Sequence, residues 1–233
     1  MPSPLSIIIM AKLPEPGRVK TRLLPDLSAQ QAADVYRHML VHVAEQVSAT
    51  QPDELVLCFD PPDSEPAIRA VLPDLDARFL PQSPGDLGHR MAAAANAIRR
   101  PNDPPNRRTL FLGVDSPDLP ADHLRQAVRL GGHADVVLGP TSDGGYWCLG
   151  LAPHVDAAAM LANIDWSSGR EADQTIASAR QMGLAVALAD PWEDGARLDD
   201  LHRLIARRDR SNAPRDLHLG RCLRTILEEI NHG

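Results

Sequence analysis

The first candidate site is a group of basic side chains that follows the first apolar segment, Leu5–Ala11. Lys12 and Lys20, the two lysines of the 233-residue chain, belong to it, although the net charge is −7. The four cations of the group are Lys12, Arg18, Lys20 and Arg22. Gly17 lies among them and lets the backbone approach a bound group closely. Cations beyond the end of a strand in an α/β sheet suit a pyrophosphate, whereas the alternative is a solvated basic loop.

A second candidate segment combines glycines with charged residues ahead of a predicted helix at Leu87–Arg99. Because the amino end of a helix attracts anions, these residues are expected to add nucleotide contacts. An alternative of equal weight makes Asp86 an ordinary helix cap. The residues concerned are Gly85, Asp86, Gly88 and Arg90.

Two aspartates follow predicted strands and are candidate metal ligands. Asp115 comes directly after the apolar segment Thr109–Val114, and Asp194 follows the last predicted strand. Carboxylate oxygens at the ligand-binding edge of a sheet are what a divalent cation bridging phosphates requires. The sequence therefore predicts Mg²⁺ or Mn²⁺ on Asp115 and Asp194.

The segment Asp143–Tyr146 contains two successive glycines between an acidic and an aromatic residue. Asp143-Gly144 alone suits a hairpin turn. Gly144 and Gly145 also suit close approach of the backbone to a sugar or nucleotide. Both interpretations remain open at this point.

The elements that must position these residues alternate along the chain. Apolar runs predict strands at Leu5–Ala11, Leu55–Phe59, Arg78–Leu80, Thr109–Val114, Asp135–Gly139, Tyr146–Leu151 and Ala185–Ala189. Helical periodicity and caps predict helices at Ser28–Val47, Leu87–Arg99, Ala121–Leu130, Arg170–Met182, Leu198–Arg208 and Leu217–Ile230. This alternation predicts an α/β fold with helices on both faces of a mostly parallel sheet. The glycine pair after Asp143 indicates one antiparallel strand.

The amino-acid composition argues against several classes of function. Apolar residues make up 43% and charged residues 24% of the chain, which is typical of a globular protein. The acidic balance argues against a nucleic-acid or anionic-membrane binder. Three separated cysteines suit a reducing compartment, and the apolar run at Leu5–Ala11 is too short to span a membrane. We expect one cytoplasmic domain over residues 1–233.

Five short motifs together carry a family resemblance that covers nearly the whole chain. They are K-x-P-x-P-G-x-V-K-T-R-L at Lys12–Leu23, G-D-L-G-x-R-M at Gly85–Met91, G-x-D-x-P-x-L-P at Gly113–Pro120, D-G-G-Y at Asp143–Tyr146 and I-x-W-S at Ile164–Ser167. With them the chain resembles a bacterial family of GT-A-fold, nucleotide-diphospho-sugar-transferase-like proteins. Its members are often described as glycosyltransferases of arsenosugar-type or radical-SAM/selenodomain-associated clusters.

The resemblance implies a three-layer, Rossmann-like GT-A fold and assigns roles to residues. The first loop is similar to the nucleotide-phosphate loop of molybdenum-cofactor and phospholactate guanylyltransferases. Nucleotide contacts are expected from Lys12, Pro16, Gly17, Lys20, Thr21, Arg22, Gly85, Asp86, Gly88 and Arg90. Catalytic roles are expected for Asp115, Asp143 and Lys20, and sugar or acceptor contacts for Asp143, Gly144, Gly145, Tyr146 and Trp166.

Two departures from the family pattern bear on activity. His89 stands where an acidic residue is common, and Ala196 stands where the late D-x-D pattern has its second carboxylate. The expected function is transfer of a sugar from a nucleoside-diphosphate sugar to a small-molecule acceptor. A nucleotidyltransferase acting on an NTP is the first alternative, and a catalytically weak nucleotide-binding protein, favoured by Ala196, is the second. The oligomeric state is left open, with a homodimer as one option.

Overall fold

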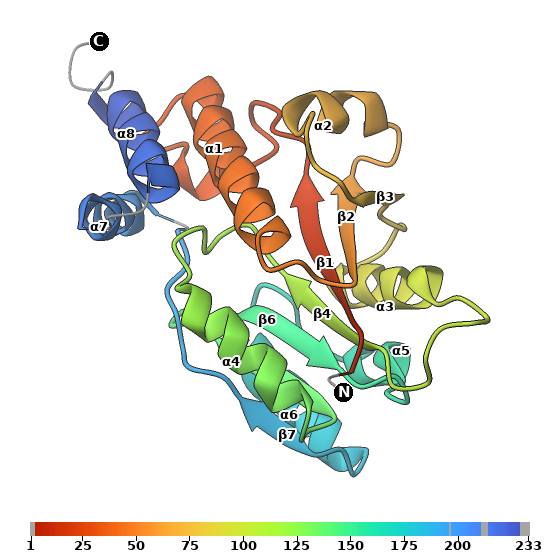
Figure 1. Ribbon diagram of the computed structural model, residues 1–233. Helices are drawn as coiled ribbons and strands as arrows, with labels where there is room; N and C mark the ends of the chain where they lie inside the picture. The colour runs from red at the N-terminus through yellow and green to blue at the C-terminus, as the bar shows by residue number, and fades with distance from the viewer. Residues whose placement is uncertain (1–2, 196, 211–213, 229–233) are drawn as a thin grey trace.

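The computed structural model describes residues 3–195, 197–210 and 214–228 (Figure 1). Its strands are β1 (Leu5–Lys12), β2 (Glu54–Asp60), β3 (Arg78–Pro81), β4 (Arg108–Leu112), β5 (Val136–Pro140), β6 (Tyr146–Leu151) and β7 (Val186–Leu188). Its helices are the 3₁₀ turn η1 (Thr21–Leu23), α1 (Ala29–Ser48), α2 (Glu65–Val71), α3 (Leu87–Ile98), α4 (Ala121–Gly131), α5 (Ala157–Leu161), α6 (Glu171–Gln181), α7 (Leu198–Asp209) and α8 (Pro214–Glu228).

The described strands form one sheet in the order β3-β2-β1-β4-β6-β5-β7. Strand β6 runs antiparallel to β4 and β5, whereas the other neighbouring pairs are parallel. The predicted α/β class with one reversed strand is therefore confirmed. Because of this topology, the loops after β1, β4 and β7 and the turn between β5 and β6 meet at one edge of the sheet.

Helices cover both faces of the sheet, as the alternation of side chains along β1 requires. Ile7 and Ile9 face the core under α1, α2, α4, α7 and α8, and Ile8 faces the core under α3, α5 and α6. In Figure 1, α1 and α4 lie in front of the sheet and α3 and α5 lie behind it. The three-layer arrangement follows because strands buried on both faces need a helical layer on each side.

The capping box expected at the start of α1 is present. The Ser28 hydroxyl accepts from the Gln31 amide at 3.2 Å, and the Gln31 side chain accepts from the Ser28 amide at 3.0 Å. These two bonds satisfy amide groups that a helix start otherwise leaves without partners. The helix thereby begins at a fixed point and carries Tyr36 to the sheet edge.

The structure differs from the sequence expectations mainly in short elements. The predicted helices lack α2 and α5, which have seven and five residues and show too few turns for a periodic pattern. Strand β4 ends at Leu112 rather than Val114. Helix α8 begins at Pro214 rather than Leu217, and its predicted end at Ile230 lies outside the described residues.

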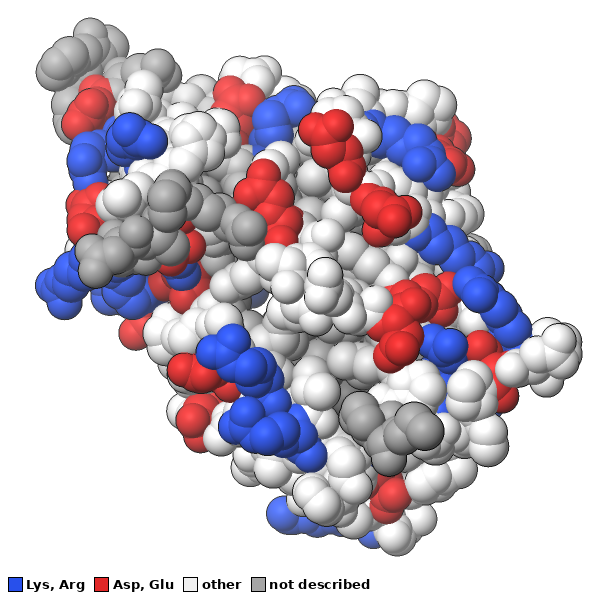
Figure 2. Space-filling view, in the orientation of Figure 1, with Lys and Arg blue, Asp and Glu red and all other residues white. Residues whose placement is uncertain are grey.

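Two further observations concern the surface. On the face shown in Figure 2, Lys and Arg side chains lie beside Asp and Glu side chains. Arg69–Glu65 and Arg125–Asp122 are ion pairs of this kind. Among the described helices, none has both the length and the hydrophobicity needed to cross a bilayer.

Gly139 supports a first prediction, because a Cβ atom there would overlap the indole ring of Trp147. That ring is buried, and its Nε1 donates to the Asp190 carbonyl at 3.1 Å. Gly139→Ala should lower the free energy of unfolding by about 1–3 kcal/mol, the usual cost of overpacking.

Gly113→Ala is the matched control, since only the Asp115 amide lies near its Cβ position, at 4.0 Å. We expect it to change the free energy of unfolding by less than about 0.5 kcal/mol. Urea denaturation of both variants measures the difference, and equal losses would contradict this packing argument.

Candidate functional site

The sheet edge where the loops meet contains a cleft of about 490 Å³. It brings together residues from η1, α1, the start of α3, the loops after β1, β4 and β7, and the segment before α6. The lining residues are Lys12, Arg18, Val19, Lys20, Thr21, Arg22, Tyr36, Leu87, Asp115, Asp143, Gly145, Tyr146, Trp166, Ser167, Glu171 and Asp194. Residues from all five quoted motifs, together with Asp194, thus line one cleft.

The basic loop forms one wall of the cleft. Val19 and Leu23 are buried and anchor the loop in the core, while Arg22 is exposed. Gly17 has a φ of 78°, so this turn uses the backbone freedom of glycine. Arg18 pairs with Glu15 at 3.2 Å on the surface. The wall therefore presents several cations on a loop that is fixed at its centre.

Lys20 is the most constrained residue of this wall. Its side chain is 4% exposed, and its Nζ lies 2.7 Å from Asp115 Oδ1. The same Nζ donates to the Gly195 carbonyl at 2.7 Å. Its φ is 48°, a conformation that costs a non-glycine residue free energy. One ammonium group therefore connects the loops after β1, β4 and β7.

Asp115 lies at the base of the cleft. Its side chain is 60% exposed, and its backbone carbonyl accepts from the Gly195 amide at 2.7 Å. Desolvation opposes ionisation of its carboxyl, but Lys20, followed by Lys12 and Arg22, outweighs this effect and lowers its pKa. Asp115 is thus a charged carboxylate that faces the cleft while it holds Lys20.

The pKa of Asp194 is shifted in the opposite direction to that of Asp115. Partial burial, followed by the charges of Asp143 and Asp115, raises its pKa to about 6, although Lys20 lowers it. Burial and the two neighbouring carboxylates together therefore outweigh the effect of Lys20 on this pKa. Among the described residues, no group of three or more His, Cys, Asp or Glu side chains is arranged to hold a metal ion. Protein groups alone would give a cation few ligands here.

The Asp143–Tyr146 segment forms part of the opposite wall and adopts the predicted hairpin turn, whereas its contact with a sugar or nucleotide stays a prediction. Asp143 Oδ1 accepts from Thr141 Oγ1 at 2.7 Å and from the Gly145 amide at 3.1 Å, which builds the hairpin turn. Asp143, Gly145 and Tyr146 nevertheless line the cleft. Gly144 has a φ of 89°, and a Cβ there would overlap the Gly169 carbonyl. Gly144 therefore lets the turn pack on the segment that carries Trp166.

The second predicted segment supports the cleft through its fold. Asp86 caps α3, because its Oδ1 accepts from the His89 amide at 2.8 Å. Arg90 Nε donates to the Gly85 carbonyl at 2.9 Å. A Cβ on Gly88 would lie 2.8 Å from the Leu161 carbonyl and 3.0 Å from the Trp166 ring. The cleft lining includes Leu87 from this segment; nucleotide contacts by its charged residues stay predictions.

Other expected residues also lie outside the lining. Pro16 and Gly17 belong to the turn of the basic loop, and Gly144 lies beneath the opposite wall. The side chain of His89 is 69% exposed, with its Nδ1 2.9 Å from Asp86 Oδ1. Ala196 lies outside the described residues.

Sequence reasoning did not single out several lining residues. Tyr36 belongs to α1, where its spacing indicated only a core position; its hydroxyl accepts from the Lys12 amide at 2.9 Å. Burial raises the pKa of Tyr36, so this hydroxyl stays neutral. Glu171 begins a predicted helix, where an acidic residue is ordinary. Val19, Leu87 and Ser167 also line the cleft; they belong to the quoted motifs but had been assigned no role.

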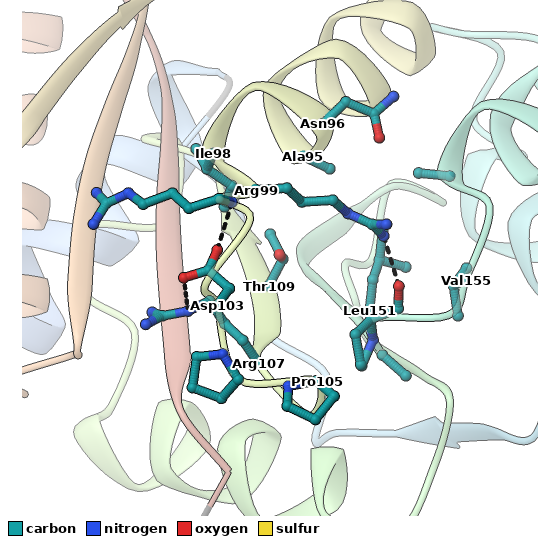
Figure 3. A pocket seen from close by; sticks show the side chains of 15 residues that line it. Ala95, Asn96, Ile98, Arg99, Asp103, Pro105, Arg107, Thr109, Leu151 and Val155 are labelled. Atoms are coloured by element: carbon teal, nitrogen blue, oxygen red, sulfur yellow. Dashed lines mark hydrogen bonds and ion pairs between the residues drawn. The ribbon is translucent and has the colours of Figure 1, made fainter.

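A second cavity, of about 260 Å³, lies at the opposite edge of the sheet (Figure 3). Three arginines line it, but each has a partner within the protein. The Arg99 side chain crosses the cavity and donates to the Pro153 carbonyl at 2.6 Å. Arg100 pairs with Glu54 at 2.6 Å, and Arg107 pairs with Asp103 at 3.0 Å. These internal bonds make it a weaker ligand site than the cleft.

Comparisons with solved structures agree on the fold. The chain superimposes on a "putative nucleotide-diphospho-sugar transferase" from Desulfovibrio desulfuricans G20 with a TM-score of 0.84 and 26% identity, over 98% of both chains. For 4-diphosphocytidyl-2C-methyl-D-erythritol synthase from Anaerococcus prevotii DSM 20548 the TM-score is 0.61 at 12% identity, over 90% of this chain and 100% of that one.

A manganese complex of Rv0371c from Mycobacterium tuberculosis H37Rv has the same fold, with a TM-score of 0.53 and 17% identity over 87% of this chain and 98% of that one. No curated protein is significantly similar to this chain in sequence. A family profile matches residues 43–168, which is more than half of the chain and includes Asp115, Asp143 and Trp166. The chain therefore belongs to the bacterial family described as "Uncharacterized protein conserved in bacteria (DUF2064)".

Proposed function

We propose that the protein is a transferase that binds a nucleoside-diphosphate sugar in the cleft and transfers the sugar to a small-molecule acceptor. The observation that carries this proposal is the opposite charge of the two walls. Lys12, Lys20 and Arg22 stand on the basic wall, and Asp143 and Glu171 stand on the other. In a nucleotide sugar the charged diphosphate joins the nucleoside to an uncharged sugar, so the diphosphate can lie at the basic wall while the sugar reaches the acidic one.

The basic wall would act on the leaving group. In sugar transfer, an acceptor oxygen bonds to the anomeric carbon, the bond from that carbon to the diphosphate oxygen breaks, and the acceptor loses a proton. The nucleoside diphosphate leaves with added negative charge. Lys20 and Arg22 would stabilise this charge, the kind of preorganised electrostatic assistance that is strongest in a site shielded from water. Asp143 is proposed to receive the acceptor proton.

The carboxylates at the base of the cleft fit a divalent cation. Burial, followed by the charges of Asp143 and Asp115, raises the pKa of Asp194, so a cation beside it would be favourable, and carboxylate oxygens are the donors that Mg²⁺ and Mn²⁺ prefer. Asp115 and Asp194 would hold the ion, which would neutralise phosphate charge. Since the described residues offer few protein ligands, phosphate oxygens must complete the shell, so we propose that metal and nucleotide bind together.

Nucleotidyl transfer is the second candidate, because the same basic loop suits the phosphates of an NTP and the fold is shared with a diphosphocytidyl synthase. A nucleotide-binding protein with weak catalysis is the third, suggested by Ala196 in place of a carboxylate. Melting temperatures measured with NDPs, NDP-sugars and NTPs, with and without Mn²⁺, separate them. Stabilisation by NDP-sugars with turnover supports sugar transfer, and stabilisation by NTPs alone supports nucleotidyl transfer. Binding without turnover of any tested pairing supports the third candidate.

Lys20→Ala is expected to weaken NDP binding by about 1.5–3 kcal/mol, which is the range for a hydrogen bond to a charged group. The reason is that the substitution removes the buried ammonium group from the basic wall. The other lysine, Lys12, is the last residue of β1 and does not replace it. Calorimetric titration with the tightest-binding NDP measures the loss.

The matched control for Lys20→Ala is Arg37→Ala. It removes one cation from the exposed surface of α1, where Arg37 pairs with Asp34 at 3.9 Å. Its NDP affinity should equal that of the wild type. Equal affinity of both variants would reject Lys20 as a phosphate ligand, provided that circular dichroism shows both folded.

Asp194→Asn is expected to raise stability and to weaken metal binding. Because the pKa of Asp194 is about 6 in the folded protein, its carboxyl proton is held more tightly there than in the unfolded chain. The stabilisation from the protonated form is complete below the unfolded value of about 3.9 and is lost as the pH rises through 6. At pH 7.5 the charge is therefore destabilising, and the amide removes it.

We expect a Tm increase of about 2–4 °C at pH 7.5, which corresponds to about 1 kcal/mol, and a smaller increase at pH 4.5. Partial exposure of Asp194 keeps the effect below the full pKa shift. Mn²⁺ binding in the presence of NDP, followed by electron paramagnetic resonance, should weaken. Asp74→Asn, an exposed position between α2 and β3, is the control and should change neither quantity. A pH-independent Tm difference would contradict the assignment.

A further inference from the structure

Glu171 is a buried carboxylate in the wall opposite the cations. It is the first residue of α6, is 9% exposed and lines the cleft. Its Oε1 accepts from the Ser168 amide at 2.8 Å. No Lys, Arg or His of the described residues pairs with it; the adjacent Arg170 pairs with Asp165 at 2.9 Å. A buried charge is costly, and the helix start compensates it only in part.

The surroundings of Glu171 contain further polar groups without partners. Tyr146 Oη, Trp166 Nε1 and Thr175 Oγ1 are buried and lack a hydrogen bond of normal geometry among the described residues. Burial raises the pKa of Tyr146, the nearby Thr175 hydroxyl lowers it, and the charge of Glu171 raises it, so Tyr146, Thr175 and Glu171 lie close together. Buried polar groups without partners are uncommon in folded proteins and call for an explanation.

The backbone beside Glu171 is also unusual. Ser167 lines the cleft with a φ of 66°, one of the positive values that side chains other than glycine rarely adopt. The neighbouring Trp166 ring stands edge-on to Tyr146, with 6.5 Å between ring centroids. Strained backbone of this kind is concentrated at ligand sites. The segment thus places the Trp166 ring against Tyr146 of β6, and both rings line the cleft together with Glu171.

The charges on this wall determine which chemical groups of a ligand it can bind. Glu171 and Asp143 both line it, and Asp194 nearby adds further negative potential. A carboxylate or phosphate placed there would meet like charges without a cation of this wall to offset them. A hydroxyl group instead donates a hydrogen bond to a carboxylate, and aromatic rings pack against the apolar faces of a sugar ring.

From these observations, and resting on the proposed function, we propose that Glu171 binds hydroxyl groups of the transferred sugar and selects a neutral hexose over an acidic one. The diphosphate remains at the basic wall, so Glu171 contributes to the sugar and not to the nucleotide. The Ser168 amide holds the carboxylate on one oxygen, and the other is left for the sugar.

The test compares three ligands that share one nucleotide: the NDP, its neutral hexose derivative and its uronic acid derivative. UDP, UDP-glucose and UDP-glucuronate are one set, and GDP, GDP-mannose and GDP-mannuronate are the other. Calorimetric titration with Mn²⁺ uses the set whose NDP binds. Wild-type protein should bind the hexose derivative about tenfold or more tightly than the NDP or the uronate derivative.

Glu171→Gln keeps the size of the side chain and an oxygen for the Ser168 amide. It should leave the NDP affinity within about twofold and reduce the preference for hexose over uronate by about tenfold. Glu171→Asp retains the charge but shortens the side chain, so it should keep rejecting the uronate while binding the hexose less tightly. Asp173→Asn, an exposed carboxylate two residues further along α6, should match the wild type.

The possible failures are distinguishable. If Glu171→Gln binds NDP normally and keeps the full preference for hexose over uronate, this inference is wrong and the proposed function stands. If the wild type binds neither UDP nor GDP nor any other NDP of the melting-temperature screen, the proposed function is wrong and the inference falls with it. If Glu171→Gln is unfolded by circular dichroism, Glu171→Asp decides: unchanged hexose affinity in that variant overturns the proposal.

Discussion

The ammonium group of Lys20 is the contact on which the cleft depends. It is almost fully buried and joins the Asp115 carboxylate to the Gly195 carbonyl, so three loops from distant parts of the chain share one charge. The left-handed backbone at Lys20 shows that the fold accepts an unfavourable conformation to aim this group inward. Arginine is a poor replacement for this lysine. Its planar guanidinium has five N–H donors, and some of them would lack acceptors at a position that holds a compact ammonium group.

This contact also explains the charge distribution of the site. By neutralising one carboxylate, Lys20 keeps Asp115 ionised, but it does not neutralise Asp194 as well. A surplus of negative charge therefore stands directly beside a loop with a surplus of positive charge. Such a gradient within a single cleft favours a ligand in which an anionic part and an uncharged part follow one another in the same order.

The sequence specified the architecture well, because the sheet is built from long apolar runs whose order and spacing leave few alternatives. Ile7 to Ile9 and Leu110 to Leu112 are buried on both faces, and such runs can hardly be anything other than central strands. The basic loop, Asp115 and the Asp143–Tyr146 turn were also found, since each combines an unusual residue type with the end of a strand. Tyr36 and Glu171 were not identified. The helix pattern explains Tyr36 as an ordinary core residue and Glu171 as an ordinary residue at a helix start. Only the fold shows that α1 and α6 place these two residues at the same edge of the sheet.

The reversed direction of β6 has a consequence for how the cleft can adapt to ligands. In a purely parallel sheet, residues that reach a ligand come from loops, which can shift independently. Here Tyr146 is the first residue of a strand and is paired with Pro140 of its neighbour, so the sheet itself fixes its position. Trp166 and Ser167, in contrast, belong to a segment outside the sheet. One side of the cleft is therefore fixed by the sheet, so any adjustment to ligands of different size falls on the segment outside the sheet.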